Sequence, residues 1–157
     1  MLECACDACA ILFSGERQKY RRVPRRVRFL PDFRMTDVQW NGLMIPIGIA
    51  FLFLNSVSGR VTALYPSPAG PVESLLALEA WKDIAHDNPE VTTMESDVEG
   101  LLVYRVGSAR EHYIIPIDEC FRLIGTIRLN WKGFSGGMAV WQEIGKFLDR
   151  LKQRTLK

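Results

Sequence analysis

The sequence predicts one α+β domain: an antiparallel sheet of four to five strands, built from two hairpin–helix units, with helices packed on it. Two pairs of apolar segments are each joined by a short polar turn, which is typical of β-hairpins. Each pair is followed by a segment with the apolar spacing of a helix. The third observation is the clearest amphipathic pattern in the chain, over residues 138–152, which predicts a C-terminal amphipathic helix.

The first half of the domain is predicted to contain a strand, a short helix, a hairpin and a longer helix. The strand at 19–29 alternates loosely between apolar and basic residues and is interrupted by Pro24, which favours a sheet edge. Three prolines between residues 65 and 71 predict an irregular loop, because proline has no amide donor. The other elements are a helix at 37–43 capped by Thr36, strands at 47–54 and 60–65, and a helix at 73–86.

The second half repeats the order of hairpin and helix. Residues 107–110 are small or polar and predict a hairpin turn. Asp118 is expected to cap the helix that follows, and the glycine-rich segment 132–137 separates that helix from the last one. The predicted elements are strands at 101–106 and 111–117 and helices at 118–130 and 138–152.

Length and hydropathy exclude two classes of protein. The chain has 157 residues, of which 48% are hydrophobic, and this composition excludes a disordered chain. Its longest apolar run, 45–54, is too short to span a bilayer, which needs about 20 residues. No secretory signal pattern is visible, so we expect a cytoplasmic protein. In that reducing compartment, clustered cysteines bind metal or carry out redox chemistry more often than they form disulfides.

The charge is unevenly distributed. The net charge is +2, yet residues 17–28 contain seven basic residues and no acidic one, so the rest of the chain is acidic. Contact with an acidic protein partner is one interpretation of this basic segment, and a charged edge strand that prevents aggregation is a simpler one. Nucleic-acid binding is disfavoured, because the segment contains a single aromatic residue, Tyr20.

Three of the four cysteines lie close to the start of the chain. Cys4, Cys6 and Cys9 form the pattern C-x-C-x2-C, and thiolates at this spacing can bind one zinc or iron ion. A closed structural site needs four ligands, and Cys120 lies on a predicted apolar helix face. We therefore expect no secure metal binding by this chain alone, and binding only where upstream residues or a partner complete the site. The alternative is three unbound thiols.

Five segments resemble an uncharacterised bacterial family, and together they represent essentially the whole chain. The genes of that family often lie beside those of uptake nickel–iron hydrogenases and their maturation factors. Similar proteins often carry a further Cys-x2-Cys element upstream, which completes a zinc-ribbon or rubredoxin-like head. This sequence lacks that element, so we expect the first cysteine pair to lie upstream of Met1. The segments are CACDACAILF at 4–13, YPSPAG at 65–70, AREHY at 109–113, PIDEC at 116–120 and WKGFSGG at 131–137.

The first functional hypothesis is a non-catalytic accessory or assembly protein of nickel–iron hydrogenase metabolism. Residues 1–16 would form the partial cysteine-rich head, and residues 17–157 a single α+β domain that binds partners. The resemblance implies a protein partner, either a hydrogenase or its maturation machinery, and a homo-oligomer is compatible with the sequence. No catalytic residue is assigned.

The alternative hypothesis is a small enzyme or ligand-binding domain. His112 lies beside a carboxylate and near Arg110, neighbours that a general base needs, although a polar hairpin is the simpler interpretation. The glycine-rich segment before the last helix offers backbone N–H groups for an anion, or else serves as a helix cap. The candidate ligand-binding residues, which include the proline-rich loop, are Tyr65, Ser67, Glu73, Arg110, His112, Ser135, Gly136 and Gly137.

Overall fold

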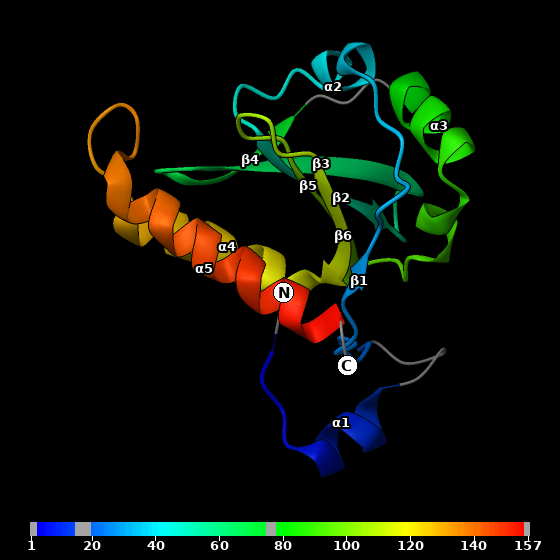
Figure 1. Ribbon diagram of the computed structural model, residues 1–157. Coiled ribbons are helices and arrows are strands. Elements are labelled where there is room, and N and C mark those ends of the chain that lie inside the picture. Colours follow the sequence, from blue (N-terminus) through cyan, green and yellow to red (C-terminus); the bar gives the residue numbers. More distant parts are fainter. Residues whose placement is uncertain (1–2, 15–19, 75–77, 156–157) are drawn as a thin grey trace.

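The computed structural model describes residues 3–14, 20–74 and 78–155 and confirms the α+β class. Its centre is a six-stranded antiparallel sheet with the strand order β1-β6-β5-β2-β3-β4 (Figure 1). The sheet therefore has one strand more than the upper limit of the prediction. The strands are β1 (Arg28–Phe29), β2 (Ile49–Asn55), β3 (Arg60–Ser67), β4 (Gly70–Ser74), β5 (Glu99–Tyr104) and β6 (Glu111–Pro116).

Both faces of the sheet are covered by helices. The helices α4 (Ile117–Asn130) and α5 (Gly137–Thr155) pack on one face, where Leu123, Ile127 and Phe147 meet apolar side chains of β2, β5 and β6. On the other face lie α2 (Asp37–Gly42), α3 (Leu78–Asp87) and the 3-10 helix η1 (Pro89–Thr93). Because successive strand residues point to opposite faces, each central strand contributes side chains to two cores.

The remaining helix, α1 (Asp7–Phe13), lies outside these layers (Figure 1). None of its residues is buried. Within the described ranges, no helix combines the length and the apolar character that crossing a bilayer requires.

The predicted strand at 19–29 is largely wrong, although its edge position is right. Only Arg28 and Phe29 pair with β6, opposite Ile114 and Tyr113. The register explains the difference: two residues further back, the partner strand reaches Pro116 and turns into α4. The described residues 20–25 therefore lie beyond the end of β6, and the β pairing of Tyr20 is an isolated parallel bridge with Ser14. Residues 17–19 lie outside the described residues.

The prediction of an irregular loop at 65–71 and a helix from residue 73 is also wrong. Strands β3 and β4 form a tight hairpin in which Ser67 pairs with Gly70 and Pro66 pairs with Pro71. The pair that closes a two-residue turn, here Ser67 with Gly70, is hydrogen-bonded, and the next pair, Pro66 with Pro71, is therefore a non-hydrogen-bonded pair, so the missing amide donors do not break the ladder between these strands. Gly70 has φ +122°, which only glycine adopts readily. Glu73 accordingly lies in β4, and α3 begins at Leu78.

The other predicted elements are present with small shifts of their ends. Thr36 caps α2 in a capping box with Gln39, as the sequence suggested for the N-cap. The N-cap of α4 is Pro116, whereas Asp118 lies in the first turn and accepts a hydrogen bond from its neighbour Glu119 (3.0 Å). The hairpin–helix order holds for β5, β6 and α4, whereas β4 intervenes between the first hairpin and α3.

Candidate functional site

The cysteine head is built around α1. Cys6 is the N-cap of this helix, and its sulfur accepts a hydrogen bond from the backbone N–H of Cys9 (3.5 Å). Cys4, Cys6 and Cys9 are free and exposed. The head is linked to the basic segment by an ion pair between Arg22 and Asp7 (3.1 Å). The thiols therefore lie on a surface that a second molecule can reach.

Cys6 differs from an ordinary thiol in its acidity. The backbone N–H of Cys9 points at its sulfur and stabilises the thiolate, which lowers the pKa of Cys6. The thiolate is the form that binds soft metals and attacks electrophiles. Cys6 is thus the thiol of the head that the local backbone activates directly.

The head also presents three consecutive apolar side chains that the sequence analysis did not single out. Ile11, Leu12 and Phe13 are 68%, 67% and 59% exposed. Side chains of a helix are buried by packing on other elements, and no residue of α1 is buried in this way. The signal in the sequence was the run of large apolar residues directly after the cysteines.

The head does not form a ready-made metal site. Across residues 3–14, 20–74 and 78–155, no three His, Cys, Asp or Glu side chains come together as a group that could hold a metal ion. Cys6 and Cys9 lie three residues apart at the start of a helix, and Cys4 lies in the extended segment before it. In this conformation the thiols do not fit a zinc or iron ion.

The structure does not bring the predicted ligand-binding residues together. Tyr65 and Ser67 lie on β3, whereas His112 lies on β6, and two strands separate β3 from β6 in the sheet. At about 4.8 Å per strand, this separation exceeds ten ångströms. Arg110 bonds within its own turn, donating to the carbonyls of Gly107 (2.9 Å) and Ala109 (2.7 Å).

The remaining candidates serve local structure. The Ser67 hydroxyl donates to the Gly70 carbonyl (2.8 Å) and stabilises the β3–β4 turn. Glu73 is an exposed residue of the edge strand β4. Ser135 accepts a hydrogen bond from the Trp141 indole (3.2 Å), and a Cβ on Gly136 would lie 2.7 Å from Val140. Gly137 is the first residue of α5.

His112 is a buried core residue. Its ring stacks on Phe33 with centroids 4.4 Å apart, only 5% of the residue is exposed, and its Nε2 atom has no hydrogen-bond partner. Burial, together with the positive charges of Arg105 and Arg110, lowers its pKa to about 4. The imidazole is therefore neutral at pH 7 and out of reach of a substrate in solution.

The basic segment is bound to the acidic body. Arg26 forms a two-pronged ion pair with Glu99, through Nε–Oε1 (2.7 Å) and Nη2–Oε2 (2.9 Å), and also contacts Glu95 (3.0 Å). Arg21 donates to the carbonyl of Ser96 (3.1 Å), near Asp97. These arginines neutralise carboxylates of the same chain, which removes much of the charge that phosphate binding would require.

A cavity of about 280 Å³ lies between the sheet and the layer of α3 and η1. Its lining is apolar except for Thr92, whose hydroxyl donates to the Pro89 carbonyl (2.6 Å). A catalytic pocket needs a few convergent polar groups to orient its substrate, and this cavity offers none free. The residues that line it are Leu54, Val61, Trp81, Ala85, Val91, Thr92 and Met94.

Thiol labelling should distinguish the exposed cysteines of the head from the buried Cys120 of the core. We expect iodoacetamide to alkylate Cys4, Cys6 and Cys9 in the native protein, whereas Cys120 reacts only after unfolding, because burial protects its thiol and raises its pKa. The alkylation rate of Cys6 should rise with pH, and the pH at which it reaches half its maximum should lie below that of a free cysteine, because the pKa of Cys6 is lowered. Peptide mass spectrometry at several pH values measures both. Native-state labelling of Cys120 as fast as that of Cys6 would contradict this assignment.

The comparisons with known proteins give a family and no activity. The model of a family of unknown function (DUF5947) matches residues 1–155, and the chain therefore belongs to that family. No curated protein and no solved structure matches the chain. The match includes the cysteine head as well as the sheet domain, so the family is defined over both. Nothing in it refers to a hydrogenase.

Proposed function

We propose that this family member is a non-catalytic accessory protein that contacts a partner protein through its cysteine head. The observation that carries the proposal is that α1 has no buried residue, and that this helix and the short segment before it present three thiols and three large apolar side chains to solvent. Among residues 3–14, 20–74 and 78–155, nothing buries any residue of this helix. A partner surface is the simplest way to cover it.

The apolar side chains supply the driving force for this contact. Burying Leu12 or Phe13 fully on a partner is worth about 1.5–3 kcal/mol for each side chain. A short helix is marginal in isolation, so its docking also stabilises the helix itself. The ion pair between Arg22 and Asp7 links the head to the rest of the chain, but both side chains are largely exposed, so this contact is weak and leaves the head free to adjust to a partner.

The thiols supply the chemistry of the contact. In this proposal, docking on the partner rearranges the segment around the start of α1, so that Cys4, Cys6 and Cys9 provide thiolates to a zinc or iron ion and the partner provides the remaining ligand. Thiolate ligands suit both ions, and the lowered pKa of Cys6 favours the coordinating form near neutral pH. The ion would then join the two proteins rather than fold one of them.

The partner we propose is a nickel–iron hydrogenase or one of its maturation factors. The support for this choice is the resemblance of the cysteine segment and of four further segments to a family whose genes often neighbour those of these enzymes. No specific observation favours the alternative of a small enzyme, because the residues that it would use lie in separate parts of the fold.

The test is co-purification of a tagged form of this chain with hydrogenase subunits and maturation factors from cells that make them. We expect recovery by the unaltered protein and loss with Leu12→Ser/Phe13→Ser. The matched control is Val57→Ser, since Val57 is 96% exposed on the β2–β3 turn, outside the head. Recovery that is equal for all three proteins, or absent for the unaltered one, would refute the proposed partner.

The metal part is tested separately by elemental analysis of the purified complex and of the free chain. We expect zinc or iron in the complex and none in the free chain. Replacing Cys4, Cys6 and Cys9 by serine should remove the metal from the complex. If the complex forms without metal, the proposed apolar contact still stands, but the proposed shared metal ion is refuted.

A further inference from the structure

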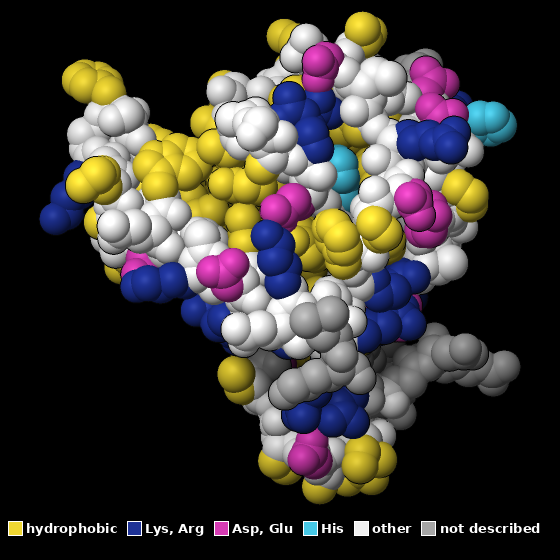
Figure 2. All heavy atoms as spheres, viewed as in Figure 1, with side chains coloured by type: hydrophobic (Ala, Val, Ile, Leu, Met, Phe, Trp, Pro, Cys, Tyr) yellow, Lys and Arg dark blue, Asp and Glu magenta, His cyan; other side chains and the backbone are white. Residues whose placement is uncertain are grey.

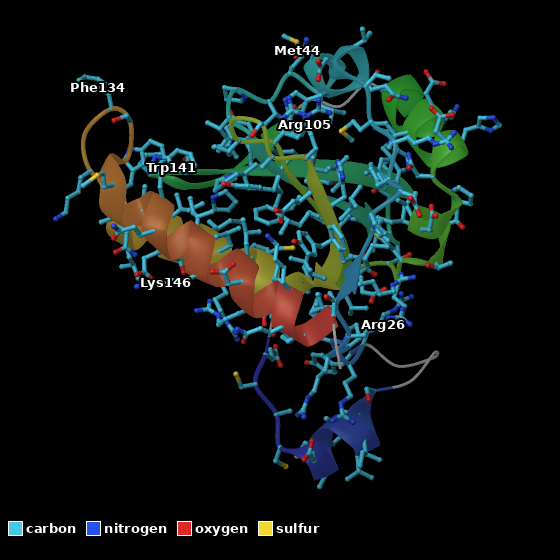
Figure 3. All side chains as sticks on the ribbon, in the orientation of Figure 1. Arg26, Met44, Arg105, Phe134, Trp141 and Lys146 are labelled. Atoms are coloured by element: carbon cyan, nitrogen blue, oxygen red, sulfur yellow. The ribbon has the colours of Figure 1, made fainter. Side chains whose placement is uncertain are left out.

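A second exposed apolar site lies at the far end of the helical pair α4–α5. We call it the hairpin tip and define it by Leu129, Lys132, Phe134 and Met138. The three apolar members are 85%, 108% and 81% exposed. Figure 2 shows hydrophobic side chains protruding at this end of the molecule, and Figure 3 shows Phe134 pointing away from the body. Aromatic and aliphatic side chains this exposed require an explanation.

The loop that carries Phe134 is held in place by two tryptophans. The Trp131 indole donates to the Gly133 carbonyl (2.8 Å), and the Trp141 indole donates to the Ser135 carbonyl (3.2 Å). The Lys132 N–H donates to the Gly136 carbonyl (3.0 Å), which closes the loop. Gly136 itself lies close to the Trp131 ring, so that a Cβ there would be 3.1 Å from it.

The consequence is that the exposure of Phe134 is built into the fold. Each residue flanking it on the loop has a backbone carbonyl fixed by an indole, and three glycines at positive φ provide the turn. A side chain displayed by an ordered loop loses little entropy on binding. The tip is therefore pre-organised for contact with something outside the chain.

The charge of the chain segment that carries the tip is of one sign up to Glu143, which pairs with Lys146 (2.7 Å). Residues 120–142 contain three basic residues, Arg122, Arg128 and Lys132, and no acidic residue. Arg122 pairs with Glu119 (3.1 Å), whereas Arg128 and Lys132 are exposed beside the apolar side chains. Elsewhere in the chain, basic residues are commonly paired with carboxylates, as Arg26 is with Glu99.

We propose that the hairpin tip binds the surface of an anionic lipid bilayer, into which Phe134, Met138 and Leu129 insert shallowly. The apolar side chains protrude from a convex end rather than line a groove, and a bilayer can deform around such a point. Lys132 and Arg128 would then lie level with the anionic headgroups. Trp131 and Trp141, amphipathic rings at the base of the tip, would lie in the interfacial region that tryptophan favours.

The test is flotation of the purified chain with vesicles of phosphatidylcholine alone and of phosphatidylcholine mixed with phosphatidylglycerol. We expect binding to the mixed vesicles that weakens as salt is added. Phe134→Ser/Met138→Ser should reduce partitioning by about tenfold or more, because two buried side chains are lost. Lys132→Glu should reduce it at low salt. Val57→Ser removes an equally exposed apolar side chain elsewhere and should change nothing.

Three outcomes would overturn the proposal. The first is no binding of the unaltered chain to anionic vesicles at low salt. The second is an equal loss with Val57→Ser and with the tip variant. The third is a concentration-dependent dimer, seen by light scattering, that the tip variant abolishes while vesicle binding persists, which would assign the tip to contact with a second copy. Variants of such exposed residues should keep the native circular dichroism spectrum, so a loss of binding reports on the tip.

Discussion

Replacing Arg26 by methionine is expected to lower the free energy of unfolding by about 3 kcal/mol. The carboxylate of Glu99 is wholly buried, and Arg26 supplies two of its hydrogen bonds, at 2.7 and 2.9 Å (Figure 3 labels Arg26). Burial by itself would raise the pKa of Glu99, but the bonds from Arg26 and from the Glu95 N–H outweigh it and lower that pKa. Without Arg26, a buried negative charge loses its main partner. Because Arg26 is half-exposed, we expect a loss of unfolding free energy at the lower end of the range that is typical for breaking a buried ion pair.

Urea denaturation at pH 7 measures this effect, and a double-mutant cycle isolates it. In a Glu99→Gln background the charge is gone, so Arg26→Met should cost about 1 kcal/mol or less. Arg25→Met is the matched control, because that neighbouring arginine is exposed and its backbone carbonyl, which accepts a bond from Arg154, is unaffected. Equal costs of Arg26→Met in both backgrounds would show that the pair does not stabilise the fold.

Acidification from pH 7 to pH 5 is expected to destabilise the protein by about 2 kcal/mol through His112 alone. Its pKa is about 4 in the folded protein and 6.5 in an unfolded chain. Between those values the unfolded state binds a proton that the folded state does not, so stability falls as the pH falls through this window. Glu99 and Glu111 have lowered pKa values, and their contributions are lost only below their ordinary value of 4.5.

His112→Phe should remove this pH dependence. The new ring keeps the stacking on Phe33 and removes the unpartnered Nε2 atom, so the stability at pH 7 should change by less than about 1 kcal/mol. His86→Gln replaces the other histidine, which is exposed, and should leave the slope unchanged. Chemical denaturation at pH 7, 6 and 5 compares the three proteins. An unaltered slope in His112→Phe would locate the acid sensitivity elsewhere.

Local sequence patterns identified most helices and strands, because each of these elements depends on interactions between residues that are close in sequence. The hairpin β5–β6, the Thr36 cap and the long helix α5 follow from turn chemistry, side-chain capping and apolar period. The errors at β1 and β4 have a different origin. Whether residues 20–27 pair as a strand depends on where β6 ends, and whether prolines fit a strand depends on which partner atoms face them. Neither is encoded within the segment.

The candidate sites also include features that the sequence shows directly and features that depend on the fold. The sequence shows directly that Cys4, Cys6 and Cys9 lie close together and that three large apolar residues follow them. The burial of His112, by contrast, requires Phe33 and Arg105 to come together with it from distant segments. Its neighbours in sequence, a carboxylate and a guanidinium, suggested reactivity, and its neighbours in space keep it neutral and out of contact with solvent.

By itself the sequence determined the α+β class, the crowding of three cysteines into residues 4–9, and the uneven distribution of charge. Those properties depend on composition and on short-range periodicity, which the fold does not alter. Only the tertiary structure decided that the basic segment is bound to buried and surface carboxylates of its own chain, and that Phe134 is displayed by a braced loop. Both depend on long-range contacts. An arginine is neutralised only where the fold places a carboxylate beside it, and an aromatic side chain is exposed only where the fold places nothing over it.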